Sequence, residues 1–299
     1  MEIRVLRYFL AVAQEESISG AAEYLHLTQP TLSRQLMDLE EELGKKLLIR
    51  GKRKVTLTED GLLLRKRAGE IIELVDKTEC EFCRSDEIIS GDICIGAGET
   101  DAMHLLAQVA KELQCDHPGI HYHLHSGNAE DVTERLDKGL LDFGILIEPV
   151  DIQKYDYLKL PATDVWGVLM PKECELAGHE VIQPEDLWDL PLICSRQNLV
   201  KHDFSNWLRR DMASVNVVTS YNLVYTASLL VEEGMGYALT LDKLVNTTGD
   251  SKLCFRPLEP RMEVGLDMVW KKYQVFSKAA GLFLSRLEEK FISANQSSK

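Results

Sequence analysis

The chain has 299 residues, of which 45% are hydrophobic and 27% charged, values that are ordinary for a soluble globular protein of about two domains. Its apolar runs fall short of the roughly 18 residues that a membrane helix needs, and its first residues lack the apolar stretch and cleavage site of a signal peptide, so we expect a cytoplasmic protein that does not bind a membrane. Its seven scattered cysteines disfavour a disulfide framework.

The net charge of −14 is unevenly distributed along the chain. Residues 1–67 carry a balance of +2, and the remainder carries −16. Residues 44–58 contain no acid but six basic side chains, Lys45, Lys46, Arg50, Lys52, Arg53 and Lys54. A basic module joined to an acidic domain favours binding to nucleic-acid phosphates, although a solvated basic loop is the alternative.

Three helices are predicted in the first 44 residues. Apolar spacing indicates one over 5–13 and a short second one over 21–25, which starts near Ser17 and Ser19. A third begins at Thr28 or Gln29, either of which can cap it, and ends at Gly44. Pro30 suits its first turn, where a missing N–H costs nothing. The apolar face of the third helix consists of Leu32, Leu36, Leu39 and Leu43.

The other face of the third helix is polar and carries Gln29, Thr31, Ser33, Arg34 and Gln35. Hydrogen-bonding side chains on a free helix face suit base edges in the major groove of DNA. Two β-prone pieces follow, at 47–50 and 54–58, and a basic turn at 51–53 joins them. Such a wing reaches phosphate or the minor groove. Three helices followed by a basic hairpin predict a winged helix-turn-helix. The alternative is a small helical bundle with a polar face and no DNA-binding role.

A long helix is expected after Glu59, with an apolar stripe that no other element of its domain covers. The stripe consists of Leu64, Ala68, Ile71, Ile72, Val75 and Phe82. Pairing with the same helix of a second copy would bury it and fix the spacing of two DNA-reading helices.

From Gly91 the pattern alternates between strands and helices, which predicts a mostly parallel α/β sheet. The expected strands lie at 92–97, 121–124, 143–147, 166–170, 191–195, 237–240 and 264–270, and the expected helices at 101–114, 128–138, 226–233 and 278–291. No nucleophile elbow, phosphate loop or metal-ligand motif accompanies them, so we expect no enzyme, no catalytic residue and no cofactor.

Residues 17–61 resemble the DNA-binding region of LysR-type transcriptional regulators. The resemblance rests on Ala21-Ala22, Leu25, Gln29-Pro30, Leu32-Ser33, Gln35-Leu36, Leu39-Glu40, Leu43-Gly44, Leu47, Arg50, Leu57-Thr58 and Gly61. It continues more loosely through His117-Pro118-Gly119, Gly139-Leu140-Leu141-Asp142, Leu187, Leu190-Pro191-Leu192-Ile193 and Gly234-Met235-Gly236-Tyr237. Leu48 stands where the family often has an aromatic residue, a departure that should affect packing more than function.

The resemblance implies a winged helix-turn-helix over 1–58, a linker and dimerisation helix over 59–89, and an effector domain over 90–299. That domain is expected to resemble a periplasmic binding protein, with two α/β subdomains, 90–161 plus 266–293 and 162–265, joined by two crossing strands. A small-molecule effector would lie between them. The resemblance further implies a dimer-based homotetramer that binds an upstream double-stranded DNA operator and contacts RNA polymerase.

The predicted DNA-binding residues are Ser17, Ser19, Thr28, Gln29, Pro30, Thr31, Ser33, Arg34, Arg50, Lys52, Arg53 and Lys54. By resemblance, Gln29, Pro30, Thr31 and Arg34 should meet base edges and Ser33 a phosphate. The predicted effector-binding residues are Gly98, Glu99, Thr100, Ser126, Gly127, Asn128, Cys194, Ser195 and Arg196. Thr100 suits either a helix cap or a ligand contact.

The charge of the effector is open at this stage. Helix N-termini that face a cleft attract anions, which makes a carboxylate-bearing metabolite the default expectation. Glu99 would repel such a ligand unless Arg196 offsets its charge or Glu99 faces away.

Two other signals suggest a regulator of metal or redox state. His121, His123 and His125 alternate along a predicted strand and therefore share one face, where imidazoles suit zinc, copper or nickel. Cys80 and Cys83 form a C-x-x-C pair at the end of the long helix. For the histidines, the favoured interpretation is that they face outwards without binding a metal. For the cysteines, it is that their thiols are buried and reduced. A secreted solute-binding protein and a DNA-binding protein without an effector are further rivals.

Overall fold

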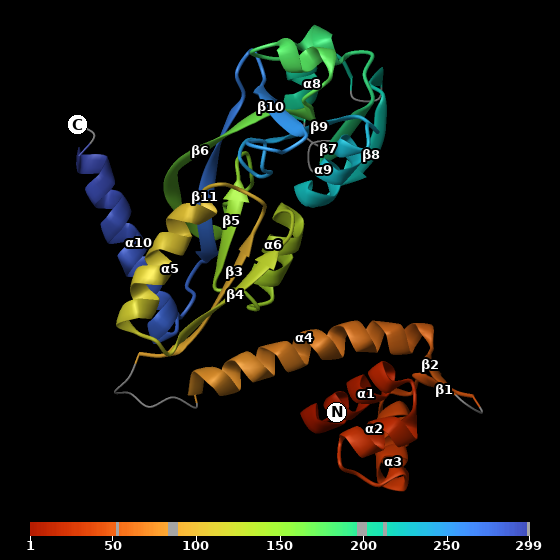
Figure 1. The fold of residues 1–299 in the computed structure, drawn as a ribbon. Coiled ribbons are helices and arrows are strands. Elements are labelled where there is room, and N and C mark those ends of the chain that lie inside the picture. Colours follow the sequence, from red (N-terminus) through yellow and green to blue (C-terminus); the bar gives the residue numbers. More distant parts are fainter. Residues whose placement is uncertain (52–53, 83–88, 196–201, 212–213, 298–299) are drawn as a thin grey trace. The chain divides into compact units, whose positions relative to one another are not determined.

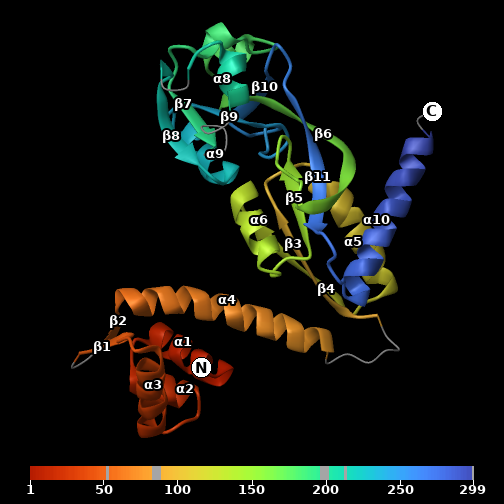
Figure 2. The same cartoon turned by 180° about the vertical axis from the view of Figure 1, so that it is seen from behind.

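The computed structural model describes residues 1–51, 54–82, 89–195, 202–211 and 214–297 (Figures 1 and 2). The chain divides into two compact units, Met1–Cys83 and Arg84–Lys299. None of the described helices is both long and apolar enough to cross a membrane.

The first unit is a three-helix bundle with a two-stranded wing and a long final helix. Its elements are α1 (Ile3–Glu15), α2 (Ile18–Tyr24), α3 (Gln29–Leu43), β1 (Leu48–Arg50), β2 (Val55–Leu57) and α4 (Glu59–Phe82). The antiparallel strands β1 and β2 pair Leu48 with Leu57. Phe9 and Val12 of α1 pack against Ala21 of α2 and Leu32 and Leu36 of α3. Small residues on α2 allow these helices to approach closely.

Local sequence signals set the ends of α3, as predicted. The Thr28 hydroxyl caps the helix by accepting from the Thr31 amide at 3.4 Å. Gly44 ends it with a φ of 64°, a left-handed conformation that favours glycine. The predicted apolar face extends one residue too far, because Leu43 is 39% exposed and Glu40 is buried instead.

Part of the apolar stripe of the long helix α4 is covered by its own domain. This corrects the expectation that no other element of the domain covers it. Ala68 and Ile72 are buried against Leu6 of α1, with Leu64 packed beside them. The α1 residue Arg7 is also hydrogen-bonded to Asp76 of α4, at 2.5 Å. Up to residue 79, the large apolar side chains of α4 that stay exposed are Leu62, Leu63, Ile71 and Leu74.

The second unit is an α/β fold built on one continuous sheet of the described strands. Its strands are β3 (Gly91–Ala97), β4 (Ile120–Ser126), β5 (Phe143–Ile147), β6 (Tyr155–Pro171), β7 (Leu192–Ser195), β8 (Val217–Tyr221), β9 (Tyr237–Leu241), β10 (Leu253–Pro257) and β11 (Glu263–Lys271). They run in the order β4-β3-β5-β11-β6-β9-β7-β8, and β10 pairs with β6.

Two long antiparallel strands, β6 and β11, run through both halves of this sheet. They pair from Tyr155–Lys271 to Val165–Glu263, with an irregularity between Gly265 and Asp267. Among the named strands, the parallel pairs are β3 with β4 and β5, and β7 with β8 and β9. The sheet is therefore mixed, with two parallel parts joined by crossing strands. The expected dividing points, 161–162 and 265–266, fall inside β6 and β11.

Helices cover both faces of each half (Figures 1 and 2). In the first half, α5 (Met103–Asp116) and α10 (Lys278–Ser297) pack together on one face through Leu106 and Phe283, and α6 (Ala129–Asp137) covers the other through Val132. In the second half, α8 (His202–Leu208) packs on one face and α9 (Val224–Glu232) on the other. Two 3₁₀ turns, Glu175–Gly178 and Pro184–Leu187, contribute to the same core as α8.

Candidate functional site

The exposed face of α3 carries the predicted base-reading side chains. Gln29, Pro30, Thr31 and Arg34 are exposed, whereas Ser33 is half-buried. The Thr31 hydroxyl lies 2.8 Å from that of Thr28, so the first turn of α3 is held by side chains as well as by its backbone. The helix therefore presents a polar and partly rigid surface.

The wing residues lie beside this face. The Arg50 guanidinium on β1 donates to the Ser33 hydroxyl at 3.0 Å, which ties the wing to α3. Lys54 is exposed and forms an ion pair with Glu16 at 2.5 Å. Lys52 and Arg53 lie outside the described residues. The Ser17 hydroxyl accepts from the Gly20 amide at 3.2 Å and caps α2, and Ser19 is exposed.

A buried carboxylate fixes the corner between α3 and the wing. Glu40 is 5% exposed, and its Oε1 accepts from the backbone amides of Leu47 at 2.7 Å and Leu48 at 3.1 Å. Lys46 lies 3.1 Å from Oε2. Burial would raise the pKa of Glu40, but these hydrogen bonds from the two amides and Lys46 outweigh it and lower the pKa. Glu40 therefore positions the wing relative to the helix.

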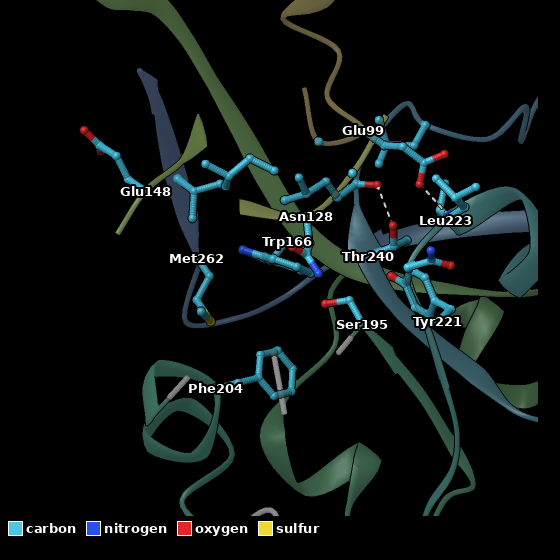
Figure 3. A pocket seen from close by; sticks show the side chains of 18 of the residues that line it. Glu99, Asn128, Glu148, Trp166, Ser195, Phe204, Tyr221, Leu223, Thr240 and Met262 are labelled. Carbon is cyan, nitrogen blue, oxygen red and sulfur yellow. Dashed lines mark hydrogen bonds between the residues drawn. The ribbon is translucent and has the colours of Figure 1, made fainter. Parts of the chain in front are cut away.

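In the second unit, a cavity opens at the carboxyl ends of the parallel strands (Figure 3). Gly98 and Glu99 follow β3, Gly127 and Asn128 follow β4, and Ile147 ends β5. From the other half come Ser195 at the end of β7, Tyr221 and Asn222 at the end of β8, and Thr240 of β9. Ligands of open α/β sheets bind in this position, where strand ends meet.

The remaining lining is largely apolar and was not predicted. It comprises Glu148, Pro149, Trp166, Phe204, Leu223, Val224, Leu241, Leu244, Met262 and Val264. Trp166 and Phe204 make an edge contact with ring centroids 6.4 Å apart. The residues after β5 and β8 could have been predicted from the sequence, because they directly follow strand ends. Trp166 and Met262 lie on or beside the crossing strands, far apart in the sequence, and no spacing connects them.

Five of the predicted effector-binding residues line this cavity: Gly98, Glu99, Gly127, Asn128 and Ser195. Thr100 does not, because it is buried and donates to Asp164 Oδ2 at 2.5 Å. Its hydroxyl also accepts from the Ala102 amide at 3.1 Å, in the turn before α5, which begins two residues later than predicted.

Cys194 and Ser126 also fall outside the lining. Cys194 is fully buried on the opposite face of β7 from Ser195, and burial raises the pKa of its thiol to about 12. Ser126 is exposed. Arg196 lies outside the described residues.

Glu99 is a half-buried carboxylate in the lining of the cavity. Its Oε2 accepts from the Val224 amide at 2.5 Å, at the first turn of α9, so it links the two halves of the unit. Burial raises the pKa of Glu99, and the Val224 amide partly opposes the rise. The next acid of the same loop, Asp101, pairs with Lys243 at 3.3 Å.

The second carboxylate of the lining, Glu148, has a cationic partner. Lys159 of β6 donates to Glu148 Oε1 at 2.9 Å. Asp267, opposite Lys159 in the sheet, is buried, and burial and the charge of Glu148 raise its pKa. The charge of Glu148 is therefore compensated within the crossing strands.

The described residues do not support the metal signal, and the redox signal lies outside them. No group of three or more His, Cys, Asp or Glu side chains in these ranges is placed to hold a metal ion. On β4, which is an edge strand, His121 and His123 are exposed and His125 half-buried. His123 lies 3.4 Å from Asp92. The side chain of Cys80, and Cys83 as a whole, lie outside the described part of the chain.

A winged helix-turn-helix with a polar recognition face, joined to a two-half α/β unit with a cavity between its parallel strands, defines a DNA-binding transcription regulator. Residues 3–62 match the model of the bacterial regulatory helix-turn-helix protein, lysR family, and residues 87–292 match the LysR substrate binding domain. The chain belongs to the LysR family.

Similar proteins are transcription regulators rather than enzymes. The Hca operon transcriptional activator HcaR of Escherichia coli K12 is 30% identical over 305 residues, covering 98% of this chain and 99% of the relative. The regulator YvbU of Bacillus subtilis is 26% identical and covers 97% and 99%. Full-length CbnR, solved with its target DNA, has a TM-score of 0.76 at 18% identity and covers 97% and 99%, a likeness of fold.

Proposed function

We propose that this regulator binds an operator through α3 and the wing, and that a small molecule in the cavity changes that binding. The observation that carries the proposal is the cavity between the carboxyl ends of two sets of parallel strands, to which Glu99 and Ser195 contribute from opposite halves. A ligand held by both halves would favour one arrangement of them over others. We place this activity in the cytoplasm, with RNA polymerase as a further partner.

For DNA, the exposed face of α3 is the proposed reader of base edges. Gln29, Thr31 and Arg34 carry donors and acceptors that match the major-groove pattern, and Pro30 begins the helix. Arg50 and Lys54, together with Lys52 and Arg53 of the wing turn, are proposed to meet phosphate. Ser17 and Ser19 at the start of α2, Thr28 and Ser33 complete the proposed interface. Full-length CbnR, which shares this fold, was crystallised with its target DNA, which supports DNA as the partner.

We further propose that two copies pair through α4 and that dimers assemble into a tetramer. The exposed side chains Leu63, Ile71 and Leu74 give α4 an uncovered apolar stripe beside the part that packs on α1. The functional division would then be 1–58 for DNA, 59–89 for dimerisation and 90–299 for the effector.

Footprinting tests the DNA-binding proposal. The full-length protein is incubated, at fixed and moderate salt, with the duplex upstream of its own gene and of the neighbouring gene. We expect a protected region with two half-sites separated by about one helical turn or a multiple of it, set by the two-fold symmetry of the dimer. Competition with random duplex measures how much more tightly the protein binds the operator than non-specific DNA. No protection on either duplex, with or without added metabolites, contradicts autoregulation.

A cavity-filling variant tests the effector proposal. Leu244→Trp puts a larger side chain into the lining, and we expect it to bind the operator as the wild type does. The variant should lose the change in operator affinity that the small-molecule fraction of a bacterial lysate causes in the wild type. Leu229→Trp, at an exposed position on α9, is the matched control and should retain the response. An equal response from both variants contradicts an effector site in this cavity.

A further inference from the structure

The charges of the cavity point to the chemical class of its ligand. We propose that the cavity takes an organic amine with an aromatic or similarly apolar body, and that its ammonium group pairs with Glu99. This inference rests on the proposed function, because it names the ligand class of the same cavity.

Among the described residues, the lining of the cavity holds carboxylates but no cationic side chain. Its two carboxylates are Glu99 and Glu148, and no Lys, Arg or His lines it in the ranges that the structure describes. Lys159 compensates Glu148 at 2.9 Å. Lys243, which follows β9, is engaged with Asp101 at 3.3 Å. Glu99 therefore differs from Glu148 in having a backbone amide rather than a cation as its partner.

The hydrogen bond from Val224 leaves half of the Glu99 carboxylate for a ligand. The Val224 amide donates to Oε2, and no described residue donates to Oε1. Glu99 is half-buried, so water solvates its charge less well than at the surface, and a cation in the cavity gains correspondingly more from pairing with it. A ligand ammonium would supply three N–H donors and the missing positive charge.

A carboxylate ligand would be repelled by Glu99 instead of attracted. Its charge would lie in the same partly desolvated cavity as Glu99, and the repulsion of two like charges there is stronger than in water. The first turn of α9, which otherwise attracts an anion, already holds the Glu99 carboxylate at the Val224 amide. Glu99 thus occupies the anion-binding position at the start of α9.

The apolar part of the lining indicates the body of the ligand. Three aromatic rings, those of Trp166, Phe204 and Tyr221, line the cavity, and Figure 3 draws Trp166 and Ser195 between Glu99 and Phe204. The Tyr221 hydroxyl donates its proton to the Leu239 carbonyl at 2.7 Å, so it has no further proton to donate to a ligand. Aromatic faces accommodate an apolar body and also attract a cation.

Three probes of one shape and different charge test this inference: phenethylamine, phenylacetate and 2-phenylethanol. Their binding to the full-length protein is measured by titration calorimetry near neutral pH. We expect phenethylamine to bind about tenfold more tightly than either of the others, because only it forms a charge-assisted hydrogen bond with Glu99.

The variant Glu99→Gln separates charge from shape. Its amide oxygen can still accept from Val224, so the link between the two halves should persist. We expect it to lose about tenfold in affinity for phenethylamine while its affinity for 2-phenylethanol is unchanged. Glu233→Gln, at an exposed position after α9, makes the same change of net charge and should match the wild type.

Several results would overturn the inference: tighter or equal binding of phenylacetate, unchanged phenethylamine affinity in Glu99→Gln, or no binding of phenethylamine at all. Its failure is distinguishable from that of the proposed function. If phenylacetate binds and Leu244→Trp abolishes that binding, the cavity stays an effector site and only the amine class is wrong. If Leu244→Trp leaves the effector response intact, the proposed function itself is wrong.

Discussion

Replacing Arg34 by alanine should weaken binding to the operator by about 1–3 kcal/mol and leave binding to a scrambled duplex nearly unchanged. Arg34 is exposed on α3, and its guanidinium can donate two hydrogen bonds to the edge of a guanine. The substitution should therefore lower the ratio of the affinity for the operator to the affinity for the scrambled duplex. Fluorescence anisotropy with labelled operator and scrambled duplexes, at one fixed salt concentration, measures both.

A change of charge alone must be separated from the loss of a base contact. Arg4→Ala removes the same charge from an exposed position on α1, where the arginine pairs with Glu2 at 3.2 Å. This control should leave the ratio of operator to scrambled affinity at its wild-type value. If Arg34→Ala keeps the wild-type ratio as well, α3 is not the element that reads the sequence through this residue.

The DNA-binding unit was largely predictable because its signals are local. The cap at Thr28, the proline at position 30 and the glycine at position 44 act within a few residues of α3, and the structure places the helix between them. Glu40 escaped prediction for the opposite reason. It stands among leucines on the apolar side, and only the fold brings the Leu47 and Leu48 amides to its carboxylate.

The effector unit was predictable where a strand end marked the site. Gly98 and Asn128 follow β3 and β4, and both line the cavity. Thr100 lies outside the lining, and no local signal announced its hydrogen bond, because its partner Asp164 is 64 residues away in the sequence. The strand β6 was predicted only over 166–170, because charged residues such as Asp156 and Lys159 interrupt the apolar pattern before it. Pairing with β11 sustains the strand from Tyr155 to Val165, and pairing with β9 and β10 sustains the rest of it.

The buried carboxylate of Glu40 should matter most for the stability of the DNA-binding unit. Glu40→Ala leaves the buried amides of Leu47 and Leu48 without their acceptor, and we expect a loss of about 2–4 kcal/mol in the free energy of opening of this unit. Hydrogen exchange of the α1–α3 and wing amides in the full-length protein, followed by mass spectrometry, measures it. Glu41→Ala, one residue on and exposed, should change the same amides by less than about 0.5 kcal/mol.

The variant Glu40→Gln and the pH dependence distinguish hydrogen bonds from charge. Both amides donate to Oε1, so the glutamine oxygen can accept from both, and we expect a loss of about 1 kcal/mol or less from the missing ion pair with Lys46. Because the folded pKa of Glu40 is lowered, its charge stabilises the unit above the ordinary carboxyl pKa, and this stabilisation is lost as the pH falls through the folded pKa. The difference between wild type and Glu40→Ala in the free energy of opening of this unit should therefore become smaller as the pH falls. A Glu40→Gln variant as unstable as Glu40→Ala would mean that the charge, and not the two amide hydrogen bonds, holds the wing against α3.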